Sequence, residues 1–404
     1  MTLPRVLLLT TYYVPVLGGV ETHARGLASH LHRAGFPVQV ITKRVAREHA
    51  VHDVVDGVPV HRVPPIGERS GRGKWLAAPF MLADALAARP SPDVIVCVDF
   101  RGVGLAAVTA GRLTGSAVIV QSETAGVMAS ASGAAGDHSG VPPESLLARA
   151  IKAPIRAVYR QADHFVCIGR DLERETLGAG IPRERVHYLP HGVDLTRFHA
   201  ATEQECVTIR AAEGLPLYAS IVLYVGRLST EKGVLDLLNA WRIVDDPRAL
   251  LLLVGPDMPG HVWDAGPAIH AFVTEHGFRD RVRVYGPASD PARLFRAADL
   301  FVQPSHFEAF GISAIEAMAS GVPVVASAVG GLRDFLVDGS NALLVPPRSP
   351  GPLGAALRRA LTDASLCRGL AGEALRTVQQ FDEHALFDAF AGLIVRAAQE
   401  KRRA

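Results

Sequence analysis

Residues 220–244 read SIVLYVGRLSTEKGVLDLLNAWRIV, and this stretch decides the fold class. An apolar run of strand length ends at Gly226, and a helical pattern of apolar residues follows from Val234. A strand that turns directly into a helix is the repeating unit of a parallel sheet that carries helices on both faces. We therefore expect an α/β protein.

The same unit recurs in two series along the chain. Apolar runs stand at residues 5–10, 37–42, 93–98, 117–121 and 164–169, and then at 220–226, 249–255, 281–286, 300–305, 323–327 and 341–346. The stretch 190–219 between the two series has no sustained period. The pattern predicts two doubly wound, Rossmann-like parallel-sheet domains facing a cleft, with a ligand at the carboxyl ends of the strands.

Composition excludes several classes of protein. The 404 residues exceed one typical core, and 49% of them are hydrophobic, so we expect two folded domains. The net charge of +2, from 42 basic and 40 acidic residues, gives no field that would recruit nucleic acid. Neither a signal peptide nor an apolar run near 18 residues is evident, and buried, reduced thiols are expected at Cys97 and Cys167. These features predict a cytoplasmic location, in solution or at the cytoplasmic face of the membrane.

Two loops carry the residues that could do chemistry. Arg227 and Lys232 flank the start of the helix after residues 220–226, where free N–H groups and two cations would suit a diphosphate. Glu308 and Glu316 stand eight positions apart in PSHFEAFGISAIEAMASG, residues 304–321, and Gly311 between them predicts a loop followed by a helix. Cations for a leaving diphosphate and carboxylates for sugar hydroxyls are what nucleotide-sugar transfer needs. Because no D-x-D sequence occurs, no metal is expected at the diphosphate.

The chain resembles the retaining GT-B glycosyltransferases of family four, within the glycogen-synthase-like superfamily. The similar stretches are GGVETHARGLASHLHRAGFPVQVIT (18–42), HGVDLTRF (191–198), VGRLSTEKGV (225–234) and PSHFEAFGISAIEAMASGVPVVASAVGG (304–331). The resemblance implies transfer of a hexose-type sugar from a nucleoside-diphosphate sugar to a hydroxyl of a glycan, lipid or small molecule, with retention and without a cofactor. It also implies an acceptor-binding domain at 1–195, joined by a C-terminal helix at 381–404, and a donor-binding domain at 196–380.

The resemblance further implies a role for each matching residue. Arg227 and Lys232 correspond to the pair that binds the donor diphosphate, Glu308 to the glutamate that faces the donor sugar, and Glu316 to the glutamate on the ribose. The backbone N–H groups of Phe310, Gly311 and Ile312 would meet the sugar and phosphate. In the first domain, Gly18 and Gly19 match a glycine pair at the donor phosphate or the acceptor, and without Cβ atoms they would let a ligand approach closely.

Two positions depart from the family pattern. Many members place a histidine near residue 121, where this chain has Ser122 or Glu123, and Glu123 could also be a solvated loop carboxylate. His191 stands where members often have asparagine, and it could either fix the interdomain turn or contact a ligand. The pairs His30/His32 and His49/His52 have no third ligand nearby in sequence, so no metal site is predicted.

Three other functions compete with transfer. Gly102, Gly104 and Ala107 form a G-x-G-x-x-A pattern after a strand, as in dinucleotide-dependent oxidoreductases, but this pattern explains neither charged loop. A GT-B sugar-nucleotide epimerase and a two-lobed binding protein are the remaining alternatives. Measurement of donor hydrolysis separates binding from turnover.

Two further segments could contact substrates or membranes. Residues 122–145 are rich in Gly, Ala and Ser, and they form either a surface loop or a substrate lid. Arg149, Lys152, Arg156 and Arg160 recur at helical spacing, with Arg69, Arg72, Lys74 and Trp75 as further contacts. They predict either peripheral docking on an anionic membrane or a core-packed helix with a solvated basic side.

Overall fold

The structure is a computed structural model that divides into two compact units. It describes residues 2–16, 18–67, 71–128, 146–244 and 246–403, with side chains in these ranges except at 71–74 and 146–151. The first unit runs to His191 and takes up the chain again from His384, and the second unit lies between them. The sequence had suggested boundaries at 195/196 and 380/381.

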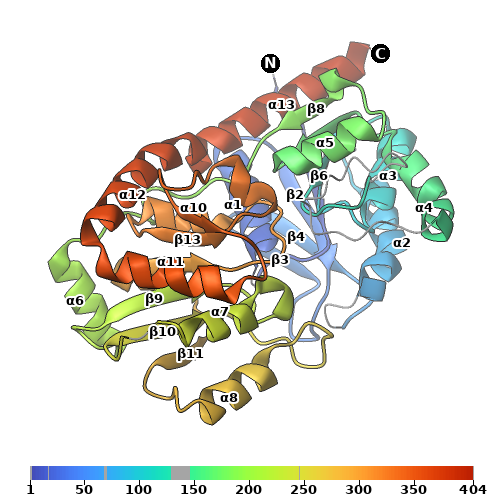
Figure 1. The fold of residues 1–404 in the computed structure, drawn as a ribbon. Helices are drawn as coiled ribbons and strands as arrows, with labels where there is room; N and C mark the ends of the chain where they lie inside the picture. The colour runs from blue at the N-terminus through green and yellow to red at the C-terminus, as the bar shows by residue number, and fades with distance from the viewer. Residues whose placement is uncertain (1, 17, 68–70, 129–145, 245, 404) are drawn as a thin grey trace. The chain divides into compact units, whose positions relative to one another are not determined.

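The first unit is built on a sheet whose strand order is β3-β4-β2-β1-β5-β6-β7-β8 (Figure 1). Its strands are β1 (Val6–Thr10), β2 (Val38–Lys43), β3 (His52–Val55), β4 (Val58–Val63), β5 (Val94–Val98), β6 (Ala117–Ser122), β7 (His164–Cys167) and β8 (Val186–Tyr188). β1, β5 and β6 are fully buried apolar runs, as expected of parallel strands covered on both faces. The order reverses between β1 and β5, so the carboxyl ends of these two strands form a topological switch point.

One edge of this sheet carries an antiparallel hairpin that the strand–helix pattern does not predict. β3 pairs with β4 in antiparallel fashion, while the other neighbouring strands of the sheet are parallel. Asp56 and Gly57 form the two-residue turn, and both have left-handed backbones, with φ of 50° and 83°. Asp-Gly favours this turn because the twist of a hairpin requires positive φ at both positions.

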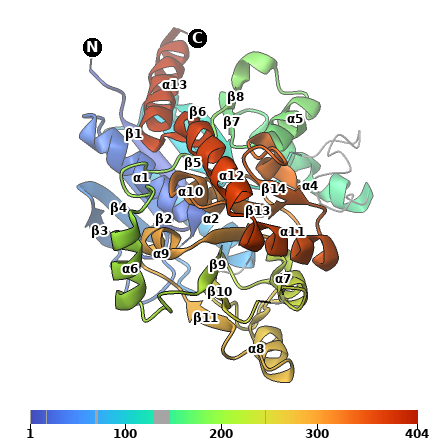
Figure 2. The same ribbon diagram turned by 60° about the vertical axis from the view of Figure 1, so that its left-hand side comes forward.

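Helices cover both faces of the first sheet. They are α1 (Gly19–Arg33), α2 (Gly71–Ala87), α3 (Gly104–Thr114), α4 (Leu146–Tyr159), α5 (Arg170–Gly178) and α13 (Glu383–Arg403), with a short 3₁₀ turn, η1, at Arg183–Arg185. α1 and α13 share one core with the sheet, in which Phe387 and Ile394 of α13 join Leu8 of β1. Polar contacts also hold α13 to this unit, from His30 to Asp388 at 2.8 Å and from Lys401 to Asp163 at 3.0 Å. Figure 2 draws α13 in red near the blue ribbons of β1 and α1, with which it shares the core. The C-terminal helix therefore completes the first unit.

The second unit has a sheet of order β11-β10-β9-β12-β13-β14, and its neighbouring strands are parallel. Its strands are β9 (Ser220–Val225), β10 (Ala249–Val254), β11 (Val282–Gly286), β12 (Leu300–Gln303), β13 (Val324–Ser327) and β14 (Leu343–Val345). Its helices are α6 (Glu203–Ala212), α7 (Val234–Trp241), α8 (Gly266–Glu275), α9 (Pro291–Ala297), α10 (Ile312–Ala319), α11 (Pro350–Thr362) and α12 (Ala364–Thr377), with 3₁₀ turns η2 (Thr230–Lys232), η3 (Gly330–Asp334) and η4 (Val378–Phe381). The order of this sheet reverses between β9 and β12.

The core of the second unit explains why α7 forms where the sequence predicts it. Val234, Leu237, Leu238 and Trp241 recur at helical spacing and are fully buried against the sheet. On the other face, Phe301 of β12 packs against Phe295 of α9, with ring centroids 5.4 Å apart. Both faces of this sheet are therefore covered, as in a doubly wound domain.

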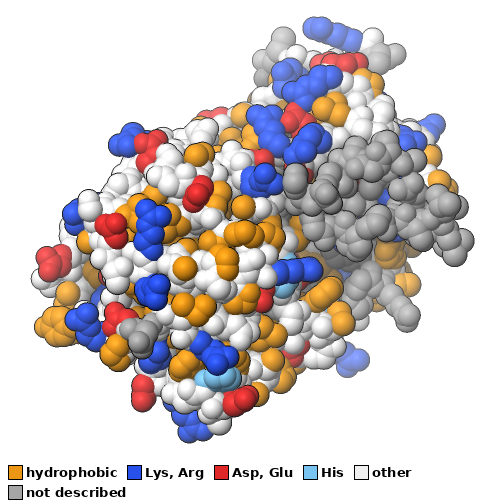
Figure 3. All heavy atoms as spheres, viewed as in Figure 1, with side chains coloured by type: hydrophobic (Ala, Val, Ile, Leu, Met, Phe, Trp, Pro, Cys, Tyr) orange, Lys and Arg blue, Asp and Glu red, His pale blue; other side chains and the backbone are white. Residues whose placement is uncertain are grey.

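The molecular surface carries both kinds of charge, as the nearly equal numbers of basic and acidic residues predict. Basic and acidic side chains are mixed over the face drawn in Figure 3. None of the helices in the described part of the chain combines the length and the apolar character that crossing a bilayer requires.

Candidate functional site

The switch point of the second unit brings the two charged loops together. β9 and β12 are neighbours, and the loop after β9 carries Arg227 and Lys232 while the loop after β12 carries Glu308. Parallel strands end at the same edge of a sheet, so both loops leave from one edge. Residues that are far apart in sequence thus form one cluster in this unit.

The loop that carries the two cations is held in place by contacts to its backbone. Tyr224 donates a hydrogen bond from its hydroxyl to the carbonyl oxygen of Arg227 at 2.7 Å. Gly233 ends the 3₁₀ turn η2 with φ of 71°, and a Cβ atom there would lie 2.0 Å from the carbonyl oxygen of Pro304. Only glycine allows this approach, which places Lys232 against the loop that follows β12.

Each cation pairs with a carboxylate. Lys232 donates from Nζ to Glu308 Oε2 at 2.8 Å, and both side chains are mostly buried. The same oxygen accepts hydrogen bonds from Gln303 at 2.8 Å and from Ser305 at 3.2 Å. Arg227 pairs with Glu231 at 2.7 Å in a more exposed position. A diphosphate that enters this site would therefore compete with carboxylates for both cations.

The turn after Glu308 is shaped by glycines and by buried aromatic rings. Gly311 has φ of 106°, and a Cβ atom there would lie 2.3 Å from Leu332 Cδ2. Phe310 is buried, and its ring centroid lies 5.2 Å from that of Phe335 and 5.7 Å from that of Phe381. α10 begins directly after this turn, and the N–H groups of Ala314 and Ile315 donate to the carbonyl oxygen of Gly311, which leaves those of Ile312 and Ser313 at the helix start without a partner inside the helix.

Glu316 lies one turn into α10, on the helix that the sequence predicts for it. Desolvation by the surrounding protein raises the pKa of this carboxyl to about 8. The negative charge of Glu383 raises the pKa further, and the positive charge of Arg197 opposes both effects. A carboxyl in this state can donate a hydrogen bond when protonated and accept hydrogen bonds from hydroxyl groups when ionised.

In the first unit, Gly18 and Gly19 stand at the start of α1. Both are exposed, and the backbone of Gly18 is extended, with φ of 168°. This conformation is open to any residue, so the glycines are explained here by exposed backbone N–H groups at a helix start and not by a special turn. Their contact with a ligand stays a prediction.

The carboxyl end of β6 is where the sequence departs from the family pattern. Ser122 and Glu123 are both buried, so Glu123 is not the solvated loop carboxylate that was one alternative. Glu123 Oε2 lies 2.8 Å from His191 Nε2, and Glu123 Oε1 accepts a hydrogen bond from Gln121 Nε2 at 2.6 Å. His191 therefore acts together with Glu123, whether it fixes the turn toward the second domain or contacts a ligand.

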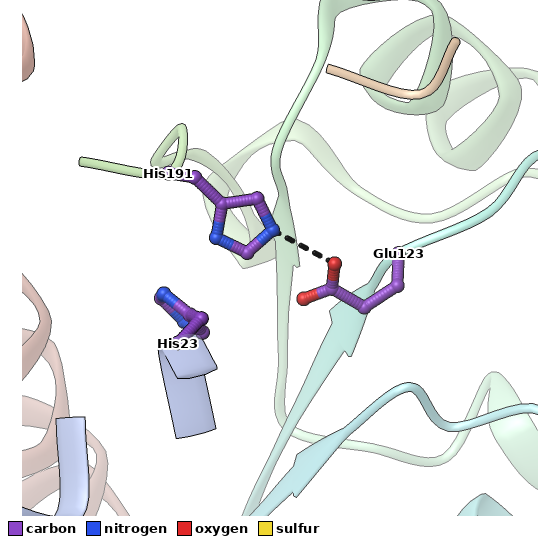
Figure 4. Close-up of side chains that lie close together, drawn as sticks. All are labelled: His23, Glu123 and His191. Carbon is purple, nitrogen blue, oxygen red and sulfur yellow. Dashed lines mark hydrogen bonds and ion pairs between the residues drawn. The ribbon is translucent and has the colours of Figure 1, made fainter. Parts of the chain in front are cut away.

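Two members of this cluster, His23 and Gln121, were not predicted from the sequence. His23 on α1 lies 3.0 Å from Gln121 Nε2, and its ring centroid lies 4.3 Å from that of His191. Desolvation, and to a smaller extent the nearby His191, lowers the pKa of His23 to about 3. His23, Glu123 and His191 come from α1, the end of β6 and the segment after β8 (Figure 4). No rule of local spacing could have joined them.

A further contact beside the donor-site loops was also missed. His306 Nε2 lies 2.6 Å from Asp236 Oδ2 of α7, and the N–H of His306 donates to the carbonyl oxygen of Glu231 at 3.0 Å. These bonds join the loop after β12 to the loop after β9. The only sign in the sequence that His306 joins these loops is its position two residues before Glu308.

The G-x-G-x-x-A pattern has a structural explanation. It lies at the turn between β5 and α3, where the N–H of Gly102 donates to the hydroxyl oxygen of Tyr159 at 3.2 Å. A Cβ atom on Gly104 would lie 2.9 Å from both Phe100 and Tyr159. Close packing of these two aromatic rings accounts for the glycine, and a dinucleotide is not needed to explain it.

The predicted basic face of residues 146–160 requires a correction. α4 forms, but Arg156 is buried and donates to the carbonyl oxygen of Val127 at 3.0 Å, so it does not belong to a solvated basic face. Lys152, Arg160 and Trp75 are exposed, while Arg69, the side chains of Arg72, Lys74 and Arg149, and the loop from 129 to 145 lie outside the described residues. Membrane contact stays a prediction.

The histidine pairs chosen from sequence lie in other contacts. His30 pairs with Asp388 at 2.8 Å, and His52 stacks on His61 with ring centroids 4.4 Å apart. Within the described residues, the group of three that could hold a metal is instead His23, Glu123 and His191.

Comparisons with known proteins cover both units. A family model described as glycosyl transferase 4-like domain matches residues 18–192, and one described as glycosyl transferases group 1 matches residues 207–376. A D-inositol 3-phosphate glycosyltransferase of Kineococcus radiotolerans is 31% identical over 431 aligned residues, which cover 98% of this chain and 96% of that protein. An uncharacterized glycosyltransferase of Methanocaldococcus jannaschii is 28% identical over 376 residues and covers 89% of each chain.

Solved structures share the fold. Sucrose-phosphate synthase from Thermosynechococcus elongatus superposes with a TM-score of 0.78 at 24% identity, covering 96% of this chain and 98% of that one. HepE of Anabaena, in complex with UDP and glucose, gives a TM-score of 0.76 at 20% identity, covering 97% and 99%. At these identities the likeness establishes the two-domain GT-B fold.

Proposed function

Because the chain belongs to the group 1 glycosyltransferases and is thus a glycosyltransferase with the GT-B fold, we propose that it transfers a sugar from a nucleoside-diphosphate sugar to a hydroxyl acceptor, with retention and without a metal at the diphosphate. The observation that carries the proposal is the meeting of Lys232 and Glu308 at 2.8 Å, with Arg227 on the same loop as Lys232. These residues stand at the strand ends where a doubly wound domain binds its ligand.

The donor binds to the second unit in this proposal. The diphosphate takes Arg227 and Lys232 away from Glu231 and Glu308, and the N–H groups at the start of α10 face its remaining oxygens. Glu308 is then released to meet the hydroxyls of the donor sugar, and Glu316 meets those of the ribose. Structural relatives with bound UDP support a uridine nucleotide as the first donor to examine.

In the transfer step, the bond between the anomeric carbon and the diphosphate oxygen breaks, and the electron pair leaves with the diphosphate. Arg227 and Lys232 stabilise the charge that develops on that group. The acceptor oxygen bonds to the anomeric carbon on the face from which the diphosphate departs. The acceptor proton passes to an oxygen of the leaving phosphate, so the products are a glycoside and a nucleoside diphosphate.

The acceptor binds to the first unit in this proposal. The glycine pair Gly18 and Gly19 offers exposed backbone at the start of α1, beside the carboxyl end of β1. The Kineococcus relative is named for an inositol phosphate acceptor, which makes phosphorylated polyols the first small-molecule acceptors to examine.

The proposal is tested by product analysis. The full-length protein is incubated with UDP-glucose or a panel of other nucleotide sugars, alone and with inositol phosphates, glycans or lipid-linked acceptors, in the presence of EDTA. We expect a glycoside whose anomeric configuration, determined by NMR, matches that of the donor. An inverted product would refute retention, and an epimerised donor or stoichiometric binding without turnover would refute transfer.

A further inference from the structure

A closed group of polar side chains lies at the carboxyl edge of the first sheet, and the transfer mechanism does not use it. His23, Glu123 and His191 each offer one ligand atom, and these atoms lie within 4.8 Å of one another (Figure 4). All three residues are buried. They converge because β1, which leads to α1, and β6 end at the same edge of a parallel sheet.

The buried carboxylate needs a compensating positive charge. The Glu123 and His191 side chains retain only 2% and 3% of their exposure. Among the ion pairs of the described residues, the partner of Glu123 is His191, and no lysine or arginine pairs with it. An isolated carboxylate in such a place is costly unless it is paired or coordinates a metal. Either an imidazolium or a metal ion can supply the charge.

The position of His23 favours a metal ion over an imidazolium. A carboxylate–imidazolium pair is complete with two residues, yet a second imidazole faces the same point, and its ring centroid lies 4.3 Å from that of His191. Phe387 covers the other side of His23, with ring centroids 5.5 Å apart, so the group lies in apolar surroundings. Two imidazoles and one carboxylate are a common ligand set for zinc.

We propose that His23, Glu123 and His191 bind one divalent transition-metal ion of the Zn²⁺ class. Ligand atoms around such an ion lie about 2.0–2.2 Å from it, which separates them from one another by roughly 3.4 Å in a tetrahedral site. Glu123 Oε2 and His191 Nε2 are now 2.8 Å apart, so they move apart by about half an ångström as the ion enters between them. Imidazole ligands disfavour Mg²⁺ and Ca²⁺, which prefer sites made of oxygen atoms.

Gln121 supports this site from the neighbouring position on β6. Its Nε2 donates to Glu123 Oε1 at 2.6 Å and so orients the carboxylate toward His191. The same amide faces His23, whose Nε2 lies 3.0 Å from Gln121 Nε2 and 3.3 Å from Gln121 Oε1, and a water molecule would complete a tetrahedral site with three protein ligands. Residues that hold a metal-binding carboxylate in this way typically change metal affinity by about 10- to 100-fold when they are replaced.

The ion would tie three separate segments of the first unit together. His191 is the last residue before the chain passes into the second unit, so the ion would fix the point from which the connection departs. The ion takes no part in the proposed transfer, in which Arg227 and Lys232 neutralise the diphosphate. The inference therefore stands or falls independently of the proposed function.

The test measures metal content. The full-length protein is produced in minimal medium supplied with Zn²⁺ or with Co²⁺, its affinity tag is removed, and the metal per chain is measured by mass spectrometry. We expect about one ion per chain and a visible absorption spectrum of tetrahedral Co²⁺ in the cobalt protein. Loading during synthesis avoids the question of how an ion enters a buried site.

Matched variants locate the ion. Glu123→Gln keeps the size of the side chain and removes its charge, and we expect the metal content to fall by roughly tenfold or more. His30→Gln, on the same helix as His23 but paired with Asp388, should retain the wild-type content. Wild-type protein with less than about a tenth of an ion per chain from either medium would overturn the proposal, because a structural site is loaded when the protein folds. Equal metal content in wild type and Glu123→Gln would also overturn it, since the ion would then lie elsewhere.

Discussion

Donor binding should release a proton from Glu316. Desolvation raises the pKa of this carboxyl to about 8, so about nine-tenths of the molecules hold it protonated at pH 7. In the proposed complex the ribose hydroxyls donate hydrogen bonds to this carboxyl, which favours its ionised form. If donor binding lowers the pKa to about 6 or below, roughly 0.8–0.9 proton leaves per donor bound at pH 7.

Isothermal titration calorimetry measures this proton directly. A nucleotide sugar is titrated at pH 7 in Tris and in PIPES, two buffers with different ionisation enthalpies, and the difference in heat gives the number of protons released. A nucleotide sugar is preferable to the free nucleotide because its diphosphate has no group that titrates near pH 7. Glu316→Gln has no proton to release at this position and should give the same heat in both buffers. Equal heats for the wild-type protein would refute the reasoning.

The same carboxyl predicts opposite pH trends for binding and for stability. Release of a proton strengthens donor binding as the pH rises from 6 to 8, by about fivefold between pH 6 and 7 for a pKa of about 6 in the complex and by nearly tenfold for a pKa of about 5 or below. The pKa in the folded, ligand-free protein lies above its ordinary value of 4.5, so this group favours folding most below pH 4.5. Its contribution is lost as the pH rises through the window from about 4.5 to about 8. Chemical denaturation of the wild type and of Glu316→Gln across this window measures the loss.

The fold class and the donor-site loops were predictable because their causes are local. Most apolar runs of strand length end at a turn and continue into a helix, as at Val225, Gly226 and Val234. Parallel strands buried on both faces need no alternation of polar residues, so continuous apolar runs identify them. The sheet order that joins the loops after β9 and β12 then follows from the doubly wound arrangement.

The β3–β4 hairpin could have been predicted as well. Asp56-Gly57 stands between two runs of strand length, which is a strong local signal for a two-residue hairpin. The alternation of strands and helices, which predicts the parallel part of the sheet, does not reveal this antiparallel edge.

The remaining differences depend on contacts that sequence spacing cannot reveal. The side chain of His23 meets that of Gln121 from 98 positions away, and Glu123 meets His191 from 68 positions away. Metal rules based on spacing consider only ligands that are close in sequence. Arg156 has the spacing of a solvated face, yet its guanidinium satisfies the carbonyl oxygen of Val127, a loop residue whose position no helical pattern gives.

Three further predictions concern the donor site. Lys232→Ala removes a charge-assisted bond to the diphosphate, so kcat/KM should fall by about 10- to 100-fold, whereas Arg376→Ala on the exposed face of α12 should leave it unchanged; equal values in steady-state assays would contradict the assignment of Lys232. The rate of transfer should be the same with EDTA as with added Mg²⁺ or Mn²⁺, and a loss of activity in EDTA that either ion restores would show that a metal assists the diphosphate. Gly233→Ala should weaken folding and donor binding together, because a Cβ atom there would lie 2.0 Å from Pro304 O and would push apart the two loops that carry Lys232 and Glu308. Gly277→Ala is the matched control, since Gly277 has a similar φ of 65° and nothing within 4 Å, so it should lose only about 1 kcal/mol to backbone strain and should keep its thermal stabilisation by UDP. If urea denaturation and UDP-dependent melting shifts are the same for the two alanine variants, the close approach at Gly233 does not hold the donor site together.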